Sequence, residues 1–395
     1  MRFLHTSDWH VGRTIRNHSR SAEHQAVFAE ILDIAKREQV DAVLVTGDIF
    51  HERRPPLEAE EIVAQTLADL ARAGIPSVVI PGNHDDAFRL RTLKPLGDLV
   101  RVHVVADFTE DLPSLVVPIP ARDGKESAVI GCLPYLHPHT VLTAAEGAGS
   151  SEDVRLQVYQ SKVQDYFRAL VEEMQRRNRA AVSIVLAHAH IAECEFGGGE
   201  WRSSVFPVNA AFLPAHVQYV ALGHMHKPQV IPGTKSQARY AGSILQMDFG
   251  EREQQKSVCL IEAHPGKPAA VTTIDLTQGK ALLRRSGTAE AILAQAAELT
   301  NAWVEIVLQP DQRTLELVDQ VRALPGVIAV RFEEAQTGGE GRIGESVNRR
   351  IGDRPATELF SDYYKLKRKN EPDPQLVALF DRLYREESTG SEAGD

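Results

Sequence analysis

The stretch Val43–Asp48, with the sequence VLVTGD, constrains the fold more than any other part of the chain. Its apolar and β-branched residues are typical of a buried parallel strand, and Asp48 follows where the strand gives way to a loop. Ligands of α/β sheets bind at the carboxyl ends of such strands. We therefore take Asp48 as the candidate centre of a metal site. The motif alone leaves a helix-capping or loop carboxylate as the alternative.

Four other predicted strand ends carry polar side chains of the same kind. They are Asp8-Trp9-His10, Gly82-Asn83-His84-Asp85, His188 and Gly223-His224-Met225-His226. Asp8 and His10 are two residues apart, so their side chains can share one face or one turn, and the same holds for His224 and His226. This recurrence favours a functional interpretation of Asp48.

The chemistry of these side chains predicts a metal centre. Carboxylate, imidazole and amide groups together suit Mn²⁺, Fe²⁺ or Zn²⁺, whereas the lack of thiolates argues against a structural zinc site. The number of candidate ligands fits two metals better than one, with Asp48 as the bridge. We expect Asp8, His10 and His226 on one metal, and Asn83, His188 and His224 on the other.

Two histidines leave alternatives open. His190 can compete with His188 for the ligand role, and we favour His188 because it directly follows the predicted strand. His84 is a candidate catalytic side chain, because beside a phosphate it can stabilise developing charge or protonate the leaving oxygen. A structural role for His84 is the alternative. We expect His18, His24, His137, His139 and His264 to be ordinary surface or core residues.

The first ~270 residues alternate strand-like and helix-like patterns, which predicts a layered α/β domain with some parallel pairing. The expected helices cover residues 26–38, 57–73 and 151–178, with Ser151 as the cap of the last one. The expected strands cover residues 43–47, 77–80, 102–105, 115–117, 128–133, 182–187, 217–222, 257–262 and 270–274.

The remainder divides into smaller parts. Residues 278–287 look like a connection, followed by a strand, a helix and a strand over 303–308, 310–323 and 327–332. We predict a main domain over 1–276, an accessory domain over 277–336, a linker over 337–354, a helical region over 355–388 and a disordered tail over 389–395. The helical region is too short to bury its apolar faces alone. It either docks on a partner or packs back onto the same chain.

Composition limits the classes of function. The formal net charge of −10 does not fit a protein that binds nucleic acid over its whole surface, so a DNA contact would be a local basic patch or would be shared with a partner. Three cysteines that are far apart predict no disulfide framework. The sequence shows no leader pattern and no apolar run of membrane-spanning length, so we expect a cytoplasmic protein.

The ordered motifs resemble those of the calcineurin-like metallophosphoesterases. More closely, Leu4–His10, Gly47–His51 with Arg53–Pro55, and Ala221–Gln229 resemble the SbcD family of nuclease subunits. The resemblance extends over nearly the whole chain. One departure is the stretch Tyr240–Phe249, where many relatives are rich in proline, and this difference affects a loop near the expected site.

The resemblance implies a metallophosphoesterase sandwich and a DNA nuclease that uses two Mn²⁺ ions, with Mg²⁺, Fe²⁺ or Zn²⁺ as alternatives. The implied activities are 3′–5′ exonuclease action on duplexes and endonuclease action on single strands and hairpins, in DNA repair and recombination. The implied assembly is a homodimer joined to the SMC-like ATPase SbcC in a heterotetramer. The 303–332 unit would be a DNA-capping domain, and the C-terminal helices would bind the ATPase.

The resemblance also suggests further site residues. His51 matches a family histidine near the active site and would help handle the DNA end, with a satisfied loop histidine as the alternative. Basic candidates for DNA contact follow the metal-bearing loops, although such residues are often only a solvated face: Arg13, Arg16, Arg20, Arg53, Arg54, Arg89 and Arg91. The alternative functions are a phosphodiesterase for nucleotides or small phosphate esters, and a scaffold without catalysis.

Overall fold

The computed structural model describes residues 1–143, 151–198, 206–309 and 315–333, together with a few single residues and short runs between 357 and 380. The chain forms two compact units, Met1–Glu333 and Glu334–Asp395. The domain boundary predicted between residues 276 and 277 lies inside the first unit and stays a prediction. The predicted linker and tail lie outside the described residues.

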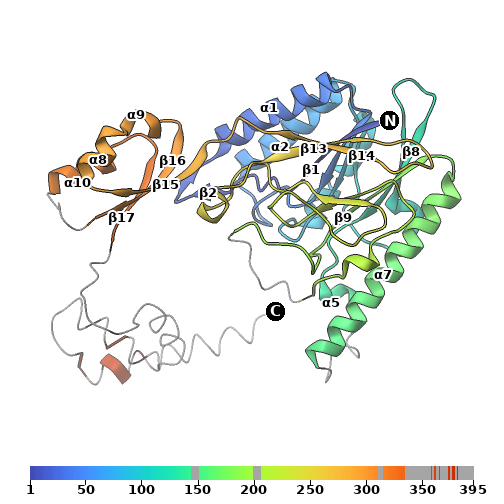
Figure 1. Cartoon of the computed structure of the whole chain (residues 1–395). Helices are drawn as coiled ribbons and strands as arrows, with labels where there is room; N and C mark the ends of the chain where they lie inside the picture. The colour runs from blue at the N-terminus through green and yellow to red at the C-terminus, as the bar shows by residue number, and fades with distance from the viewer. Residues whose placement is uncertain are drawn as a thin grey trace. The chain divides into compact units, whose positions relative to one another are not determined.

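The first of two six-stranded sheets has the strand order β14-β13-β1-β4-β5-β6. Its strands β1, β13 and β14 are labelled in Figure 1. Its members are β1 (Arg2–Thr6), β4 (Ala42–Thr46), β5 (Ser77–Ile80), β6 (Val102–Val104), β13 (Ser257–Glu262) and β14 (Ala270–Asp275). The four strands from β1 to β6 in this order are parallel, whereas β13 pairs antiparallel with both of its neighbours.

The second sheet has the order β11-β12-β10-β9-β8-β7. Its members are β7 (Val116–Pro120), β8 (Ser127–Leu133), β9 (Val182–His188), β10 (Tyr219–Gly223), β11 (Gln229–Val230) and β12 (Gln237–Tyr240). The central strands β8, β9, β10 and β12 are parallel, and the edge strands β7 and β11 pair antiparallel. Each sheet therefore brings several strand carboxyl ends to one edge.

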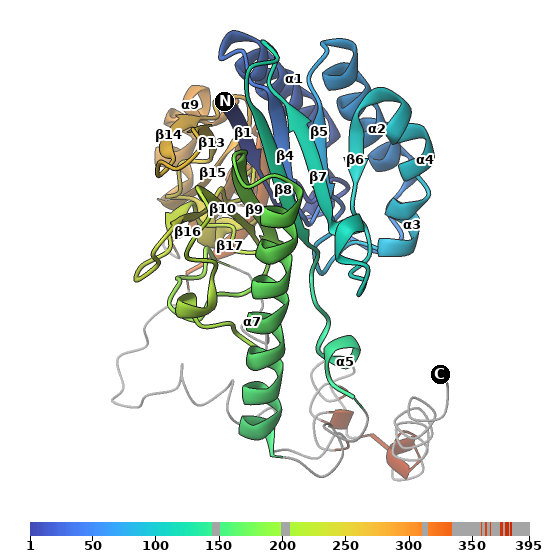
Figure 2. The same cartoon turned by 90° about the vertical axis from the view of Figure 1, so that its right-hand side faces the viewer.

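Helices cover the outer faces of the two sheets. The helices α1 (Ser21–Arg37) and α2 (Leu57–Arg72) pack against the first sheet, and α7 (Glu152–Arg177) lies along the second (Figure 2). Ser151 caps α7 as predicted, because its side chain accepts a hydrogen bond from the backbone of Val154. The shorter helices are α3 (Ala87–Arg91), α4 (Lys94–Gly97), α5 (Pro138–Val141), and the 3₁₀ turns Asp98–Val100, Leu112–Leu115, Ala210–Phe212 and Phe249–Glu251.

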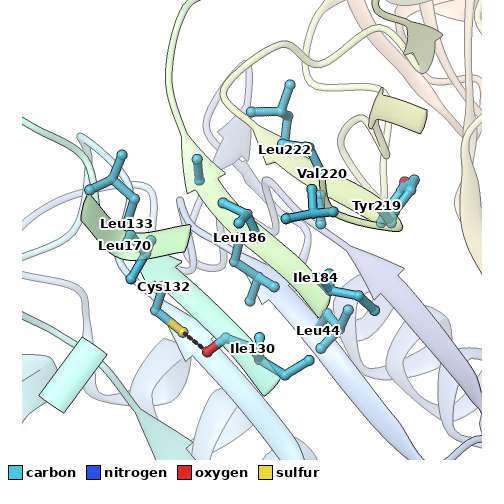
Figure 3. Close-up of a cluster of buried hydrophobic side chains, with 14 of the residues drawn as sticks. Leu44, Ile130, Cys132, Leu133, Leu170, Ile184, Leu186, Tyr219, Val220 and Leu222 are labelled. Carbon is cyan, nitrogen blue, oxygen red and sulfur yellow. Dashed lines mark hydrogen bonds between the residues drawn. The ribbon is translucent and has the colours of Figure 1, made fainter. Parts of the chain in front are cut away.

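Strand pleating divides the buried residues between two layers. In β1 and β4, Phe3 and Leu44 face the second sheet, whereas Leu4 and Val43 belong to the cluster under α1 and α2. Figure 3 shows Leu44 beside Ile184 and other residues of the second sheet. The β-branched runs are buried on both faces, as expected for parallel strands.

A third, smaller sheet lies to one side of the sandwich (Figure 1). It contains β15 (Ala281–Gly287), β16 (Ala302–Leu308) and β17 (Val327–Phe332), all parallel, with α8 (Ala289–Ala294), α9 (Ala296–Leu299) and α10 (Leu315–Arg322). The prediction of a connection over 278–287 was wrong, because seven of these residues form β15. That strand has a weak signal, since only Leu282 in it is fully buried.

The smaller sheet is joined to the sandwich by packing and hydrogen bonds. Ile15, in the ribbon of β2 (Thr14–Ile15) and β3 (His18–Ser19), packs with Phe249 and Leu282. Glu23 on α1 accepts hydrogen bonds from the indole of Trp303 at 2.7 Å and from the backbone of Lys280 at 2.9 Å.

The predicted C-terminal helical region, residues 355–388, lies within the second unit, and only a few of its residues are described. Phe360 and Phe380 are both helical, and their rings stack with centroids 4.3 Å apart. Within the described ranges, no helix combines the length and apolar character that a membrane span requires.

Candidate metal centre

The predicted ligands lie where strands of both sheets end. Asp8 follows β1, Asp48 follows β4 and Asn83 follows β5, while His188 is the last residue of β9 and His224 follows β10. The loops after β1 and β4 continue to pair beyond the strands. The backbone N–H of Asp8 donates to Gly47 at 3.0 Å, and that of His10 donates to Asp48 at 2.9 Å. This pairing fixes Asp8 and His10 beside Asp48.

Three motif glycines permit this convergence. A Cβ atom on Gly47 would clash with the His188 ring, one on Gly82 would clash with the Asp48 carboxylate, and one on Gly223 would clash with the Thr46 carbonyl. The glycine therefore matters in each motif because the backbones and ligand side chains approach too closely for any larger residue.

Backbone strain is concentrated at the same place. Eight described non-glycine residues have a positive φ, and four of them are candidate ligands: Asp8 (49°), His10 (47°), Asp48 (49°) and His224 (115°). Such conformations are uncommon for residues with a Cβ atom and cluster at functional sites. The structure therefore marks the candidate ligands independently of their chemistry.

One group of side chains contains Asp8, His10 and His226, whose ligand atoms lie within 4.8 Å of one another. Nε2 of His10 is 3.0 Å from Nε2 of His226 and 3.5 Å from Oδ2 of Asp48. All three members are buried. These are the residues that the sequence analysis assigned to the first metal.

A second group contains Asp8, Asp48 and His188. Nε2 of His188 is 3.6 Å from Oδ2 of Asp48 and 3.1 Å from Oδ1 of Asn83. Nδ1 of His224 is 2.9 Å from the same Asn83 oxygen. Asp48 thus contacts imidazoles of both groups, and Asp8 is a member of both.

His190, the competing candidate, lies beside these groups rather than within them. Its ring is tilted against that of His224 with centroids 5.9 Å apart, and it also packs against Phe196. The geometry therefore favours His188 as the ligand.

The hydrogen bonds show that this cluster fits cations. Nδ1 of His188 donates to the carbonyl oxygen of Thr46 at 2.8 Å, so Nε2 of the neutral ring presents a lone pair. That lone pair faces the oxygens of Asn83 and Asp48, which are also acceptors. Groups of acceptors that face one another in a buried site are relieved by a bound metal ion.

The same argument applies to the first group. Nδ1 of His226 donates to the buried carboxylate of Glu251 at 2.8 Å, which leaves Nε2 of His226 as a lone pair toward His10. Among the residues that the structure describes, Nδ1 of His10 is buried without a hydrogen-bond partner. Both groups therefore fit the expected divalent cations.

The pKa shifts of the clustered side chains also indicate a site for cations. Burial, and then the neighbouring carboxylate of Asp48, raise the pKa of Asp8 well above its usual value. Burial, and then the neighbouring imidazole of His226, lower the pKa of His10 well below its usual value. Burial also lowers the pKa of His224 well below its usual value. Paired buried carboxylates and neutral imidazoles form a site that cations stabilise.

The candidate catalytic histidines lie against the first group. Nδ1 of His84 donates to the backbone carbonyl of His51 at 2.8 Å, and the backbone N–H of His84 donates to Oδ1 of Asp48 at 2.9 Å. The His51 and His84 rings stack with centroids 5.7 Å apart. Burial, and then the charge of Arg13, lower the pKa of His51 to about 4.

Two supporting carboxylates escaped the sequence analysis. Asp85 accepts hydrogen bonds from the backbones of Ile49, Phe50 and Gly82 at 2.8–3.1 Å, so it joins the loops after β4 and β5. Burial, and then the Asp48 carboxylate, raise the pKa of Asp85 to about 7. Its place in the motif was visible in the sequence, but its role was not.

Glu251 has no comparable signal, because it belongs to a charged loop far along the chain. Burial alone would raise its pKa, but the hydrogen bond from His226 and the charge of Lys256 lower the pKa of Glu251 to about 2. Ser243 and the backbone of Met247 also donate to it. Such a carboxylate orients the histidine that binds a metal.

The candidate DNA-contacting arginines differ in their surroundings. The prediction that Arg20 contacts DNA was wrong, because its side chain is buried in a salt bridge with Glu23 and cannot reach a phosphate. The other six are at least partly exposed. Arg13 donates to the carbonyl of Met247, and the ion pairs are Arg16 with Glu305, Arg89 with Glu60 and Arg91 with Asp107, whereas Arg53 and Arg54 are exposed.

Comparison with known proteins places this architecture in a family. The model of the calcineurin-like phosphoesterase family matches residues 1–228. The SbcD protein of the SbcCD nuclease from Bacillus subtilis is 34% identical over 399 aligned positions, which cover 96% of this chain and 97% of that protein. This chain belongs to the SbcD family.

Other SbcD proteins are also similar. The protein from Escherichia coli K12 is 29% identical over 82% of both chains, and that from Rhodobacter capsulatus is 33% identical over 72% of this chain and 71% of its own. The resemblance inferred from the motifs and the predicted metallophosphoesterase fold are therefore confirmed. The match to the calcineurin-like phosphoesterase model includes the strands that precede or carry the candidate ligands Asp8, Asp48, Asn83, His188 and His224.

Proposed function

We propose that this chain is the nuclease component of a DNA-end-processing complex and hydrolyses DNA phosphodiester bonds at the centre around Asp48. The observation that carries the proposal is the set of acceptor groups that converge on this carboxylate from both sheets. Membership of a family whose relatives are named as nucleases supports DNA as the substrate.

Two divalent cations, Mn²⁺ in our proposal, fit this ligand set. Asp8, His10 and His226 with Asp48 would hold one ion, and Asn83, His188 and His224 with Asp48 would hold the other. Asp8 is a second candidate bridge, because it is a member of both groups. When bound, such a pair stabilises charge on the phosphoryl oxygens and activates water for an in-line displacement.

His84 is the proposed proton-transfer residue. The carbonyl oxygen of His51 can only accept a hydrogen bond, so Nδ1 of His84 always carries its proton. Nε2 is therefore the atom of His84 that gains or loses a proton beside the substrate. His51 holds this orientation through its carbonyl, and its ring packs on the His84 ring. In the protonated state, Nε2 of His84 can donate to the leaving oxygen.

The proposed assembly follows the family. An SbcC-type SMC-like ATPase would bind the C-terminal helices, and two copies of this chain would pair within a heterotetramer that acts on DNA ends in the cytoplasm. The names of the relatives, as subunits of SbcCD, support a second type of chain in the complex. Duplex exonuclease action in the 3′–5′ direction and cleavage of single strands and hairpins are the proposed activities.

Cleavage of end-labelled DNA tests the proposal. Purified protein with Mn²⁺ is given duplex, hairpin and single-stranded DNA, alone and with an SbcC-type ATPase plus ATP. We expect cleavage by the wild type, loss of most turnover in His84→Gln, and full activity in the control His264→Gln, whose side chain is exposed and distant in the fold. Hydrolysis of a chromogenic phosphodiester without cleavage of any DNA would instead indicate a small-phosphoester hydrolase.

A further inference from the structure

A pocket of about 420 Å³ opens beside the candidate metal centre, and five of its lining residues carry an aromatic ring. Its volume lies within the range of about 300–1,000 Å³ that is usual for ligand sites. Gly82 and Asp85, which flank Asn83 and His84, form the wall toward the metal centre. The rings that line it are Phe88, Phe108, Tyr135, His137 and His139.

Three of these rings form a row that begins at the metal ligands. Tyr135 packs beside His224, with ring centroids 6.3 Å apart and planes within 21° of each other. His137 follows at 4.7 Å from Tyr135, and His139 follows at 5.2 Å from His137. Tyr135 and His137 are half-buried, whereas His139 is exposed. The row therefore leads from the metal centre to the surface.

A further ring that lines the pocket belongs to a helix. Phe88, on α3, is 67% exposed, whereas phenylalanine side chains are usually buried. The guanidinium of Arg91 lies over this ring, 4.8 Å from its centroid. Phe88 therefore adds a further exposed ring to the lining of the same pocket.

One cationic side chain in the pocket can contact an anionic group, while the carboxylates of the pocket are bonded to other groups. Of its three carboxylates, Asp85 accepts backbone N–H groups, Asp86 caps α3 and Asp107 pairs with Arg91. Arg53 is exposed, lines the pocket and has no carboxylate partner in the part of the chain that the structure describes. Its guanidinium is therefore available for a phosphate group.

We propose that the row Tyr135, His137 and His139 is a base-stacking subsite that holds an unpaired DNA strand next to the metal centre, while Arg53 contacts a phosphate of that strand. This inference rests on the proposed function. Every base has a π face that stacks on an aromatic ring, so binding at this subsite does not depend on the base sequence of the DNA. Bases within a duplex are already stacked, so the pocket selects single strands and frayed ends.

Binding by metal-free protein tests this inference without turnover. The probe is a fluorescein-labelled single-stranded oligonucleotide, and the readout is fluorescence anisotropy. The double variant H137A/H139A should bind about 10-fold to 100-fold more weakly, because each lost ring removes a stacking partner. The ring-retaining variant H137Y/H139Y should bind as the wild type does. H264A, which removes an exposed histidine elsewhere, is the matched control.

Salt dependence tests the part assigned to Arg53. Arg53→Gln should lower the slope of log affinity against log salt by about one, as expected for the loss of one phosphate contact. An unchanged slope would overturn this contact.

The possible failures are distinguishable. If the wild type with Mn²⁺ cleaves DNA but H137A/H139A binds the oligonucleotide as tightly as H264A does, the stacking subsite is wrong and the nuclease function stands. If the metal-loaded wild type cleaves no DNA, the proposed function fails, and this inference fails with it.

Discussion

Asp48 shows how much of a site one residue can hold together. Its Oδ1 accepts the backbone N–H of His84, and its Oδ2 faces the rings of His10 and His188. Its left-handed φ of 49° turns the chain out of β4 at the point where the other motifs meet. Sequence reasoning found these residues because each is a metal-ligating type in a short motif at or just beyond the end of an apolar strand.

Residues that act through a ligand were beyond that reasoning. Glu251 follows no strand end and stands in a loop with several other charged residues, so only the fold shows that it reaches His226. Arg20 was predicted to contact DNA because it follows the first motif. Closeness in sequence does not show whether a side chain is exposed, and that of Arg20 is buried against Glu23.

Removal of Glu251 should weaken metal binding. Glu251→Ala frees the His226 ring to rotate and to lose the tautomer that presents Nε2, so we expect affinity for Mn²⁺ to fall about 10-fold to 100-fold. Isothermal titration calorimetry of the metal-free protein measures this change. Glu253→Ala, which removes a neighbouring exposed carboxylate, is the control, and equal affinities in the two variants would contradict the prediction.

His24 should give the fold a dependence on acid. Carbonyl oxygens of Trp9 and Arg20 face the two ring nitrogens of His24 and favour its protonated form, but the larger effect of burial lowers the pKa of His24 from 6.5 to about 4. Between pH 6.5 and 4, His24 is therefore protonated in the unfolded chain and neutral in the folded chain. The stability present above pH 6.5 is lost as the pH falls to 4. The pKa shift corresponds to about 3 kcal/mol over this window.

Urea unfolding of metal-free protein at several pH values tests this prediction. His24→Gln should lose about 3 kcal/mol less free energy of unfolding than the wild type between pH 6.5 and 4. His264→Gln should keep the wild-type dependence, because that side chain is exposed. The same acid dependence in His24→Gln and the wild type would be evidence against this role.

At the scale of elements, strong periodicity was predicted well and weak patterns were missed. The strands β4 and β5 and the helices α2 and α7 appear within two residues of their expected bounds. The helix α1 begins at Ser21 rather than near residue 26. The apolar pattern missed its first turn because the buried residues there, Glu23 and His24, are polar. The same lack of an apolar pattern hid β15, in which Leu282 is the only fully buried residue.

The junction of the two sheets leaves no room for a side chain at the end of β10. A Cβ atom on Gly223 would clash with the Thr46 carbonyl and the Ser7 hydroxyl and would lie 2.9 Å from Nδ1 of His188. Gly223→Ala should therefore lower the free energy of unfolding by about 1–3 kcal/mol or more. The accompanying displacement of His188 should weaken metal binding.

Chemical denaturation measures that loss, and Gly266→Ala is the comparison. Gly266 has a positive φ, but a Cβ atom there meets nothing within 4 Å, so this variant reports backbone strain without a clash. A loss in Gly223→Ala that is no larger than the loss in Gly266→Ala would contradict the close approach of the sheets.

At the scale of the molecule, the first unit is a two-sheet sandwich with a small parallel sheet fastened to its side. The junction depends on Glu23, which joins Arg20 to Trp303 and Lys280, and on Arg16, which pairs with Glu305. The contacts of Glu23 with the smaller sheet, and that of Arg16 with Glu305, do not follow from a local pattern, because more than 200 residues separate the partners. The candidate metal ligands, by contrast, could be recognised as a set in the sequence because their motifs share one chemistry, and the structure brings them together.

The central claim is that the site around Asp48 cleaves DNA with the help of metal ions. The most direct test is single-strand cleavage by metal-stripped protein before and after Mn²⁺ is returned, for the wild type and Asp48→Ala. We predict that Mn²⁺ restores cleavage by the wild type and not by Asp48→Ala, which loses the shared ligand. Cleavage by Asp48→Ala at the wild-type rate, or no DNA cleavage by wild type shown to hold Mn²⁺, would contradict the account.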